Sequence, residues 1–489
     1  MTDVQNREEP LAGGIPSAIE TEKVTRRVGP VLAVLVISAF IMMLNETALS
    51  VALPPIMGEF GVEAATAQWL TTGFMLTLAV VIPTTGFLIQ RFTTRALFVA
   101  ALLLFIVGTI IAIVAPSFVV LLIARVVQAA GTAIILPLLM TTTLTSVAPE
   151  KRGVMMGLNS VVISMAPAVG PTLAGIIVDA LDWRWMFGMM LVVGAIVFVL
   201  GIALIRTDNE TIRARIDVFS IILSAIGFGG LVYALSSISL IIRGDLAPVV
   251  ALVVGLIALV GFVTRQVRLQ KTDSALLDLR PFAVSNFRFS VIVVITAMAM
   301  MLGTVVVMPI YLQVGLDVSI MTTGLMMLPG GLIQGILSPF AGKIYDKVGP
   351  KPVVIPGIIL MAGGQFWLST VGTDTPVMLV VAMHFVFCIG MSMVMTPLMT
   401  VALGSLPRRL YPHGSAIMNT LQQLAGAAGT AVLVAGMTIG AGIAATAGAG
   451  AALAQAEGAQ TAFIVGGIIG LIGVVFSLFV GRIKAEAQH

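Results

Sequence analysis

Long apolar stretches dominate the chain, and short polar breaks separate them. Fourteen of these stretches approach the length of about 20 residues that a helix needs to cross a bilayer. They centre near residues 42, 78, 106, 131, 166, 195, 229, 256, 300, 333, 361, 388, 426 and 472. The breaks are short except for a basic linker at 265–287 and an Ala- and Gly-rich stretch at about 439–460, which we expect to be an extended loop. The pattern predicts an all-α polytopic membrane protein with 14 transmembrane helices.

Lysine and arginine alternate along the chain as membrane topology requires. Of the 26 Lys and Arg residues, 23 lie in alternate loops beginning with the N-terminal tail, and one, Arg125, lies within a span. The opposite loops hold only Arg184 and Arg243. Because basic residues are retained on the cytoplasmic side, we expect both termini in the cytoplasm. The predicted location is a bacterial-type cytoplasmic membrane.

Composition supports a chain surrounded by lipid. Hydrophobic residues make up 58% of the sequence and charged residues 10%, which is more apolar surface than a soluble fold can bury. The net charge of +4 follows from the basic inner loops, so no nucleic acid partner is expected. A single cysteine, Cys388, excludes an internal disulfide. Arg26 and Arg27 precede an apolar run too long for a signal peptide, so residues 1–28 should form a cytoplasmic tail.

A polar, basic turn recurs in the two halves of the chain. After the second span the chain reads Gly86-Phe-Leu-Ile-Gln-Arg91, and after the tenth it reads Gly342-Lys-Ile-Tyr-Asp346-Lys347. If spans seven and eight are an insertion, both turns follow the second helix of a six-helix set, as in transporters built from two bundles. The predicted division is a tail at 1–28, an N-terminal bundle at 29–207, two inserted helices with a linker at 208–286, and a C-terminal bundle at 287–489.

Further motifs occur in the spans where a transporter of this plan would carry them. They are Leu122-Ile-Ala-Arg125-Val-Val-Gln128-Ala-Ala-Gly131, Pro167-Ala-Val-Gly170-Pro171-Thr-Leu-Ala-Gly175, Trp183-Arg184-Trp185-Met-Phe187, Tyr311-Leu312-Gln313 and Gly414-Ser415-Ala-Ile-Met-Asn419. Together with the basic turns, they resemble the signatures of 14-span drug:proton antiporters of the major facilitator superfamily, over about residues 30 to 480. The resemblance implies a major facilitator fold with two six-helix bundles and two inserted central helices. It also implies proton-coupled export of hydrophobic, often cationic small molecules by alternating access, with the proton gradient as energy source and no cofactor.

Glu46 is the only carboxylate in the middle of an apolar span, and Arg125 is its only basic counterpart. A charge at the centre of an inserted helix costs about 2.5–3.5 kcal/mol, so such residues usually serve transport. Each lies about 10 Å from the outer end of its span, at about 1.5 Å of rise per residue. We therefore expect the two to couple proton movement to transport. A static ion pair that locks two helices, or direct attraction of a cationic substrate by Glu46, stays open.

The first span departs from the family pattern. The family reads Leu-Asp-x-Thr there, whereas this chain reads Leu44-Asn45-Glu46-Thr47, which moves the acid by about 100° around the helix. The first basic turn also has Gln90 and Thr93 where the family has Asp and Gly. We expect the longer Glu46 side chain to reach back toward the cavity, and the inner latch to rest on the second turn.

Two groups of residues are candidates for gating. The outer group is Gly170, Pro171 and Gly175, and the inner group is Gly86, Arg91, Asp346 and Lys347. In the outer group, glycine permits close helix packing and proline bends the helix, although ordinary packing explains these residues equally well. In the inner group, we expect Asp346 to cap a helix or pair with a base and so hold the inner side closed. A solvated loop acid is the alternative.

Polar residues within the apolar spans mark the expected substrate cavity. They are Asn45, Gln128, Gln313, Gln334, His384, Asn419 and Gln422. Gln365 and Gln423 are further polar residues that should face protein or water and not lipid. The 28 methionines suit a surface that adapts to differently shaped ligands, although membrane packing explains most of them individually. His384 either titrates near neutral pH or simply makes a hydrogen bond.

These features predict a monomeric multidrug exporter that binds hydrophobic or cationic small molecules and protons within the lipid bilayer. An exporter of one antibiotic or metabolite is the alternative. The sequence has no phosphate-binding loop that would indicate ATP drive, and no His/Cys/Asp cluster that would indicate a metal or a catalytic site. A membrane sensor or a channel is disfavoured, because the chain has neither a soluble output domain nor a ring of pore charges.

Overall fold

The computed structural model describes residues 18–62, 64–205, 217–238, 241, 244–272 and 274–483. Within these ranges the structure does not describe the side chains of residues 18–28, 50, 51, 64, 65, 162–164, 167, 168, 171 and 320. Every regular element of the described residues is helical. The all-α prediction is therefore confirmed.

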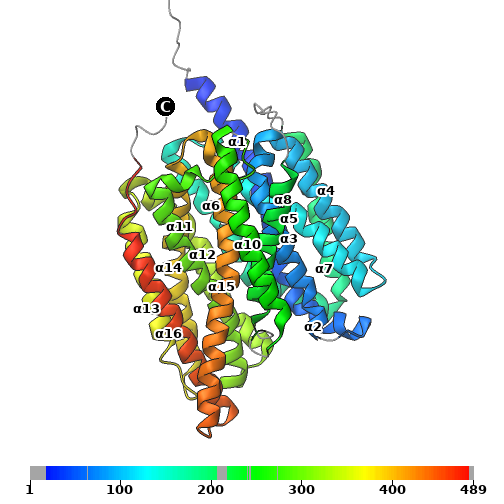
Figure 1. The fold of residues 1–489 in the computed structure, drawn as a ribbon, viewed down its shortest axis with the longest axis vertical. Helices are drawn as coiled ribbons and strands as arrows, with labels where there is room; N and C mark the ends of the chain where they lie inside the picture. The colour runs from blue at the N-terminus through cyan, green and yellow to red at the C-terminus, as the bar shows by residue number, and fades with distance from the viewer. Residues whose placement is uncertain are drawn as a thin grey trace, which may run out of the picture.

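Fourteen helices of 18 residues or more account for nearly all of the described chain (Figure 1). The first six are α1 (Ala18–Phe60), α3 (Trp69–Arg91), α4 (Thr94–Ile113), α5 (Phe118–Ser146), α6 (Arg152–Ala180) and α7 (Trp183–Leu204). Two more follow, α8 (Val218–Ser236) and α10 (Leu246–Leu269). The last six are α11 (Ser285–Ile310), α12 (Ile320–Val348), α13 (Lys351–Leu368), α14 (Val377–Gly404), α15 (Tyr411–Thr446) and α16 (Ala451–Ser477).

The fourteen helices coincide with the fourteen apolar stretches of the sequence. Thirteen are long and apolar enough to cross a membrane when only the described residues are considered. The fourteenth long helix is α6, which has 29 residues and several side chains outside the description. Short elements complete the chain, among them α2 (Ala64–Ala67), a π-helical turn at Tyr311–Gly315 and a 3-10 turn at Arg408–Leu410.

The first six and the last six helices pack in the same pattern. In the first set α1 packs on α6 and α7, α4 on α5 and α7, and α3 on α5. In the second set α11 packs on α15 and α16, α13 on α14 and α16, and α12 on α14. This correspondence is the one expected of a parallel repeat. The domain boundaries proposed from the sequence stay a prediction.

The two bundles meet at one end of the molecule. We call this the terminal end, because α1 begins there and the described chain ends there (Figure 1). Contacts between the bundles run through α6 on α12 and through α3 on α15. Away from this end, α2 and α7 on one side diverge from α15 and α16 on the other (Figure 1).

Glycines let the backbones of α6 and α12 touch at the terminal end. A Cβ atom added at Gly342 would collide with the backbone of Gly153, and one at Gly157 would lie 2.6 Å from the Pro339 Cα. Small residues of this kind allow close helix approach in membranes. At these two points the backbones of α6 and α12 therefore meet without a side chain between them.

The expectation of an extended loop at about 439–460 is wrong. Helix α15 continues to Thr446, and α16 begins at Ala451. Only a short turn intervenes, in which Gly448 has a φ of +87° that favours glycine. Alanine is the strongest helix former, and Gly440 and Gly458 leave the space in which α15 and α16 pack on each other. The repetitive alanines and glycines of this stretch thus lie mostly in helices and not in an irregular loop.

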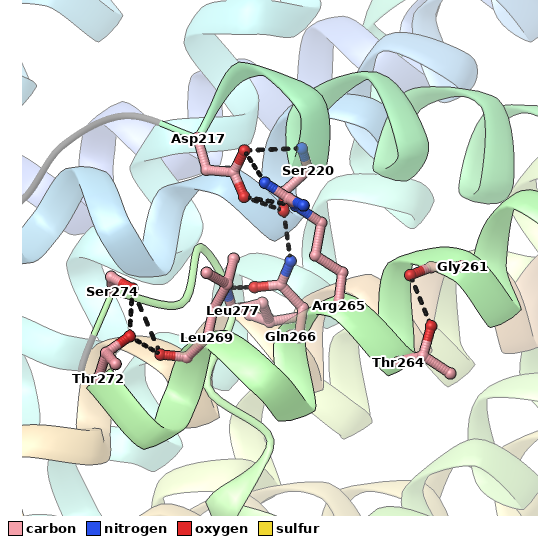
Figure 2. A network of polar contacts seen from close by, with 10 residues as sticks. All are labelled: Asp217, Ser220, Gly261, Thr264, Arg265, Gln266, Leu269, Thr272, Ser274 and Leu277. Carbon is pink, nitrogen blue, oxygen red and sulfur yellow. Dashed lines mark hydrogen bonds and ion pairs between the residues drawn. The ribbon is translucent and has the colours of Figure 1, made fainter.

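Asp217 starts α8 and joins it to α10 (Figure 2). Its carboxylate accepts hydrogen bonds from the Ser220 hydroxyl at 2.6 Å and from Arg265 Nε and Nη2 at 2.8 and 3.0 Å. The Arg265 guanidinium is the main cause that lowers the pKa of Asp217 from 3.8 to about 2, and the Ser220 hydrogen bonds add to it. The two inserted helices are thus fastened together at the terminal end.

We expect Asp217→Asn to destabilise the detergent-solubilised protein by about 1 kcal/mol at pH 7, a figure discounted for the partial exposure of Arg265. Because folding lowers the pKa of Asp217, its contribution is complete above pH 4 and is lost as the pH falls toward 2. Melting temperatures of both proteins between pH 7 and pH 3 should therefore converge. An equal difference at both ends of this range would mean that Asp217 acts through packing and not through its charge.

Candidate functional site

Arg125 lies fully buried on α5 at the centre of a polar network. Its guanidinium carbon is 4.2 Å from the centroid of the Phe74 ring on α3, a cation–π contact that gains strength away from water. Arg125 Nη1 donates to Gln128 Oε1 at 3.0 Å and to the Asn45 carbonyl at 3.4 Å. These contacts connect α5 to α1 and α3, so a charge that is costly in the membrane has several compensating partners.

Gln128 extends the network to a fourth helix. Its Oε1 also accepts from Asn45 Nδ2 at 3.3 Å, and its Nε2 donates to Thr109 Oγ1 of α4 at 2.9 Å. Asn45, Gln128 and Thr109 are all fully buried. The sequence motif Arg-x-x-Gln therefore places the two side chains one turn apart on α5, where they bind each other and bridge to α1 and α4.

Glu46 lies beside this network without completing it. Its carboxylate and Arg125 are close enough to interact electrostatically, but among the described residues the two form no ion pair within 4 Å. Glu46 Oε2, Arg125 Nε and Arg125 Nη2 are buried and have no hydrogen-bond partner in the described part of the chain. Leaving such a group unsatisfied costs about 1–3 kcal/mol. The described part of the site therefore has one buried acceptor and two buried donors without a partner.

Asn45 occupies the position of the usual acid in the first span, and Glu46 lies next to it. Asn45 faces Gln128 through its side chain and Arg125 through its carbonyl. Glu46, one residue later, still reaches the field of Arg125. The amide therefore takes the structural contacts, while the neighbouring carboxylate is left free of hydrogen bonds at Oε2.

The remaining predicted cavity residues do not gather around Arg125. Asn419 Nδ2 donates to the Met140 sulfur of α5 at 3.3 Å, across the closed terminal end. Gln422 contacts the Met399 sulfur at 3.7 Å. Gln334 and His384 are buried in the C-terminal bundle, where His384 Nε2 lies 3.5 Å from Cys388 Sγ. Gln313 is half-buried in the π-helical turn.

The other two glutamines singled out in the sequence also lie apart from Arg125. Gln365 donates to Thr304 within the C-terminal bundle at 2.6 Å, and Gln423 is half-buried on α15. In this state, therefore, only Asn45 and Gln128 of the predicted cavity residues adjoin the charged site.

Asp346 connects the bundles at the terminal end. Its two carboxylate oxygens accept hydrogen bonds from the backbone amides of Gly153 at 2.9 Å and Val154 at 3.1 Å. These amides belong to the first turn of α6, where an anion is favoured by the helix dipole and by unsatisfied N–H groups. Asp346 of α12 thus caps α6 across the interface. The adjacent Lys347 is exposed and has no ion pair among the described residues.

The first basic turn also lies at the terminal interface. Gln90 Nε2 donates to the Arg409 carbonyl at 3.0 Å, and a Cβ atom at Gly86 would come within 2.8 Å of His413 Nδ1. The Arg91 guanidinium lies 5.8 Å from the centre of the Phe92 ring. The amide of Gln90 therefore joins α3 to the turn before α15 through a hydrogen bond that a carboxylate could not donate.

The outer gating candidates lie on α6 beside α1. Gly170 is buried where a Cβ would collide with Thr47 Oγ1, next to Glu46 in the sequence, and this hydroxyl donates to the Ala166 carbonyl at 3.1 Å. Gly175 is half-buried. The side chain of Pro171 lies outside the described residues. Gly170 therefore sets the distance between α6 and the part of α1 that carries the acid.

Phe74 and Thr109 were missed by the analysis of the sequence. Both complete the surroundings of Arg125 and Gln128, but each belongs to a span in which it looks like an ordinary apolar or small polar residue. Only the packing of α3 and α4 on α5 brings them to the site.

Comparison with known proteins agrees with this architecture. A family model described as Major Facilitator Superfamily matches residues 35–430. Lincomycin resistance protein LmrB of Bacillus subtilis (strain 168) is 42% identical over 468 residues, covering 94% of this chain and 97% of that protein. A Multidrug resistance protein B homolog of Mycobacterium tuberculosis is 30% identical over 410 residues, covering 82% of this chain and 74% of the homologue.

A solved structure shows the same fold. The human organic anion transporter MFSD10 (TETRAN) superposes with a TM-score of 0.65 at 14% sequence identity, covering 92% of this chain and 99% of that one. The fold expected from the sequence motifs is thereby confirmed. The chain is an integral membrane transporter and not an enzyme, and it belongs to the major facilitator superfamily.

Proposed function

We propose that the protein is a secondary active antiporter that exports small hydrophobic, often cationic molecules in exchange for protons. The observation that carries the proposal is Glu46, a buried carboxylate with an unpartnered oxygen beside a fully buried arginine network. An intramembrane acid of this kind usually marks a proton or substrate route. The relatives named for lincomycin and multidrug resistance support a drug as the exported substrate.

Alternating access would link Glu46 to transport. With the terminal end closed by Asp346 and the glycine contacts, Glu46 would be reached from the opposite end. A proton arriving from that side neutralises Glu46, weakens its attraction for a bound cation and favours release of the cation. After the bundles move to open the terminal end, Glu46 releases its proton to that side. The carboxylate can then attract the next substrate. Arg125 favours proton release because it stabilises the carboxylate form.

The orientation follows from the basic loops. We place the terminal end, and with it both chain termini, in the cytoplasm of a bacterial-type cell membrane. The protein then works as a monomer in the lipid bilayer, drawing its energy from the proton gradient without a cofactor. Protons then enter the cell from outside, and drugs move in the opposite direction, out of the cell.

A narrower substrate range is the second candidate. The relatives at 42% identity are named for resistance to lincomycin, whereas the named multidrug homologue is 30% identical. Export of one antibiotic class would agree with the higher identity to the proteins named for lincomycin resistance. Competition between lincomycin and ethidium for proton-driven uptake into everted vesicles separates the two candidates, because a multidrug exporter transports both and a narrow one transports lincomycin alone.

Glu46→Gln should abolish proton-driven ethidium or lincomycin uptake into everted vesicles while preserving exchange of labelled for unlabelled substrate without a gradient. The amide keeps the size of the side chain but cannot carry the proton. Glu59→Gln is the matched control, because Glu59 also lies on α1 but is partly exposed and bound by Arg184, which lowers its pKa. We expect that control to transport normally.

Gradient-driven uptake that persists in Glu46→Gln would overturn the role of this residue as proton carrier. Uptake by the unmodified protein that ignores the gradient would instead overturn antiport itself. Loss of both uptake and exchange in the variant would assign Glu46 to substrate binding in place of proton transfer.

Asp346→Asn should favour opening of the terminal end, since hydrogen bonds to a charged acceptor are worth about 1.5–3 kcal/mol and those to a neutral amide less. In a Cys388→Ser background, a cysteine introduced at the buried Ser338 position reports this opening. Its labelling by a water-soluble maleimide should accelerate roughly ten-fold, as expected for about 1.4 kcal/mol. Lys347→Gln serves as control, and equal labelling rates in both variants would contradict the latch.

A further inference from the structure

The connection between α10 and α11 crosses the terminal end as a buried segment, residues 274–280, which we call the strap. Connecting segments normally run over the surface, but Leu276, Leu277 and Asp278 are only 1%, 3% and 3% exposed. The two leucines belong to the same hydrophobic cluster as Phe87 of α3 and Tyr411 of α15. The strap is therefore packed against the place where the bundles meet.

One end of the strap is fastened to the inserted helices (Figure 2). The fully buried Gln266 of α10 accepts a hydrogen bond from the Leu277 amide at 3.1 Å and donates to the Ser220 hydroxyl of α8 at 2.7 Å. Ser220 in turn donates to Asp217, which Arg265 holds through two nitrogen atoms. Gln266 is thus fixed in one orientation before it binds the strap.

The other end of the strap reaches the gate. The Asp278 amide donates to His413 Nδ1 at 3.3 Å, and His413 is buried in the first turn of α15. On its other side His413 lies against α3, where a Cβ at Gly86 would come within 2.8 Å of the same nitrogen. The Asp278 carboxylate is already occupied by the amide and guanidinium of Arg280. The backbone amide of Asp278 therefore makes the hydrogen bond that joins the strap to the gate, beside the apolar packing of Leu276 and Leu277.

The helices beneath the strap contact both bundles. Helix α8 packs on α3 of the first bundle and also on α15 of the second. Opening of the terminal end requires α3 and α15 to separate at Gly86 and His413. The strap must then part from α15, from α10, or from both.

The two attachments differ in how firmly the acceptor of each hydrogen bond is held. The strap is held to α10 by a 3.1 Å bond from a glutamine that a closed polar network orients, and to α15 by one 3.3 Å bond. Shorter, better supported hydrogen bonds are the stronger ones. The strap should therefore stay with α10 when α15 moves.

From this geometry we infer that Gln266 is a positioning residue for the gate: the inserted helices hold the strap in place, and the strap stabilises the closed terminal end through His413. This gives α8 and α10 a part in the transport cycle. The inference rests on the alternating access of the proposed function, but it does not depend on which substrate or ion drives the cycle.

Distances between the bundles test the inference directly. In a Cys388→Ser background, spin labels are attached to cysteines at Arg95 and Lys351, exposed positions at the terminal starts of α4 and α13. Double electron–electron resonance then gives the populations with the terminal end open and closed. Gln266→Leu should raise the ratio of open to closed roughly two- to ten-fold, the effect of losing a typical hydrogen bond of about 0.5–1.5 kcal/mol.

A matched control lies two residues away on the same helix. Thr264 is exposed, and among the described residues its hydroxyl donates to the Gly261 carbonyl of its own helix (Figure 2). Thr264→Val should therefore leave the distance distribution unchanged. Equal distributions for Gln266→Leu and the unmodified protein, or equal shifts for Gln266→Leu and Thr264→Val, would overturn the inference.

A second variant covers the case in which Gln266→Leu does not fold. Ser220→Ala removes the hydroxyl that orients Gln266 but keeps the bond to the strap, so it should shift the distribution in the same direction by a smaller factor. No shift in this variant would count against the inference. Because no substrate or gradient is used, these results are independent of the Glu46 experiment. A negative result for the strap would therefore not contradict proton coupling at Glu46.

Discussion

The structure depends on stabilising a charged arginine side chain that is buried away from bulk water. Arg125 tolerates full burial because Phe74, Gln128 and the Asn45 carbonyl surround its guanidinium. These contacts tie α1, α3 and α5 together, and Thr109 adds α4 through Gln128. Glu46 Oε2 has no hydrogen-bond partner among the described residues, so the surroundings that stabilise the arginine leave this carboxylate oxygen unsatisfied. This difference between the two residues is the basis of the proposed proton coupling.

The gate at the terminal end uses another kind of contact. Backbone meets backbone at Gly153 and Gly342, and Asp346 binds main-chain amides. Beside these contacts lies a buried apolar cluster that includes Phe87 of α3 and Tyr411 of α15. The closed terminal end is therefore held by main-chain contacts and by apolar packing together.

Much of the fold could be predicted because helices that cross a membrane need long apolar segments, which are easily recognised in a sequence. Long apolar runs and the loop positions of Lys and Arg placed all fourteen long helices. The stretch at about 439–460 misled because its small residues serve helix packing, as Gly440 and Gly458 show. Contacts between distant segments left no local signal: Asp346 caps a helix that begins almost 200 residues earlier, and Phe74 reaches Arg125 from another helix.

Proton exchange at Glu46 is the central claim, and proton release on ligand binding measures it most directly. Purified protein in weakly buffered detergent is titrated with ethidium or lincomycin while a pH indicator records released protons. The account predicts release from the unmodified protein and none from Glu46→Gln, although the variant still binds the ligand. Equal proton release from both proteins would contradict it.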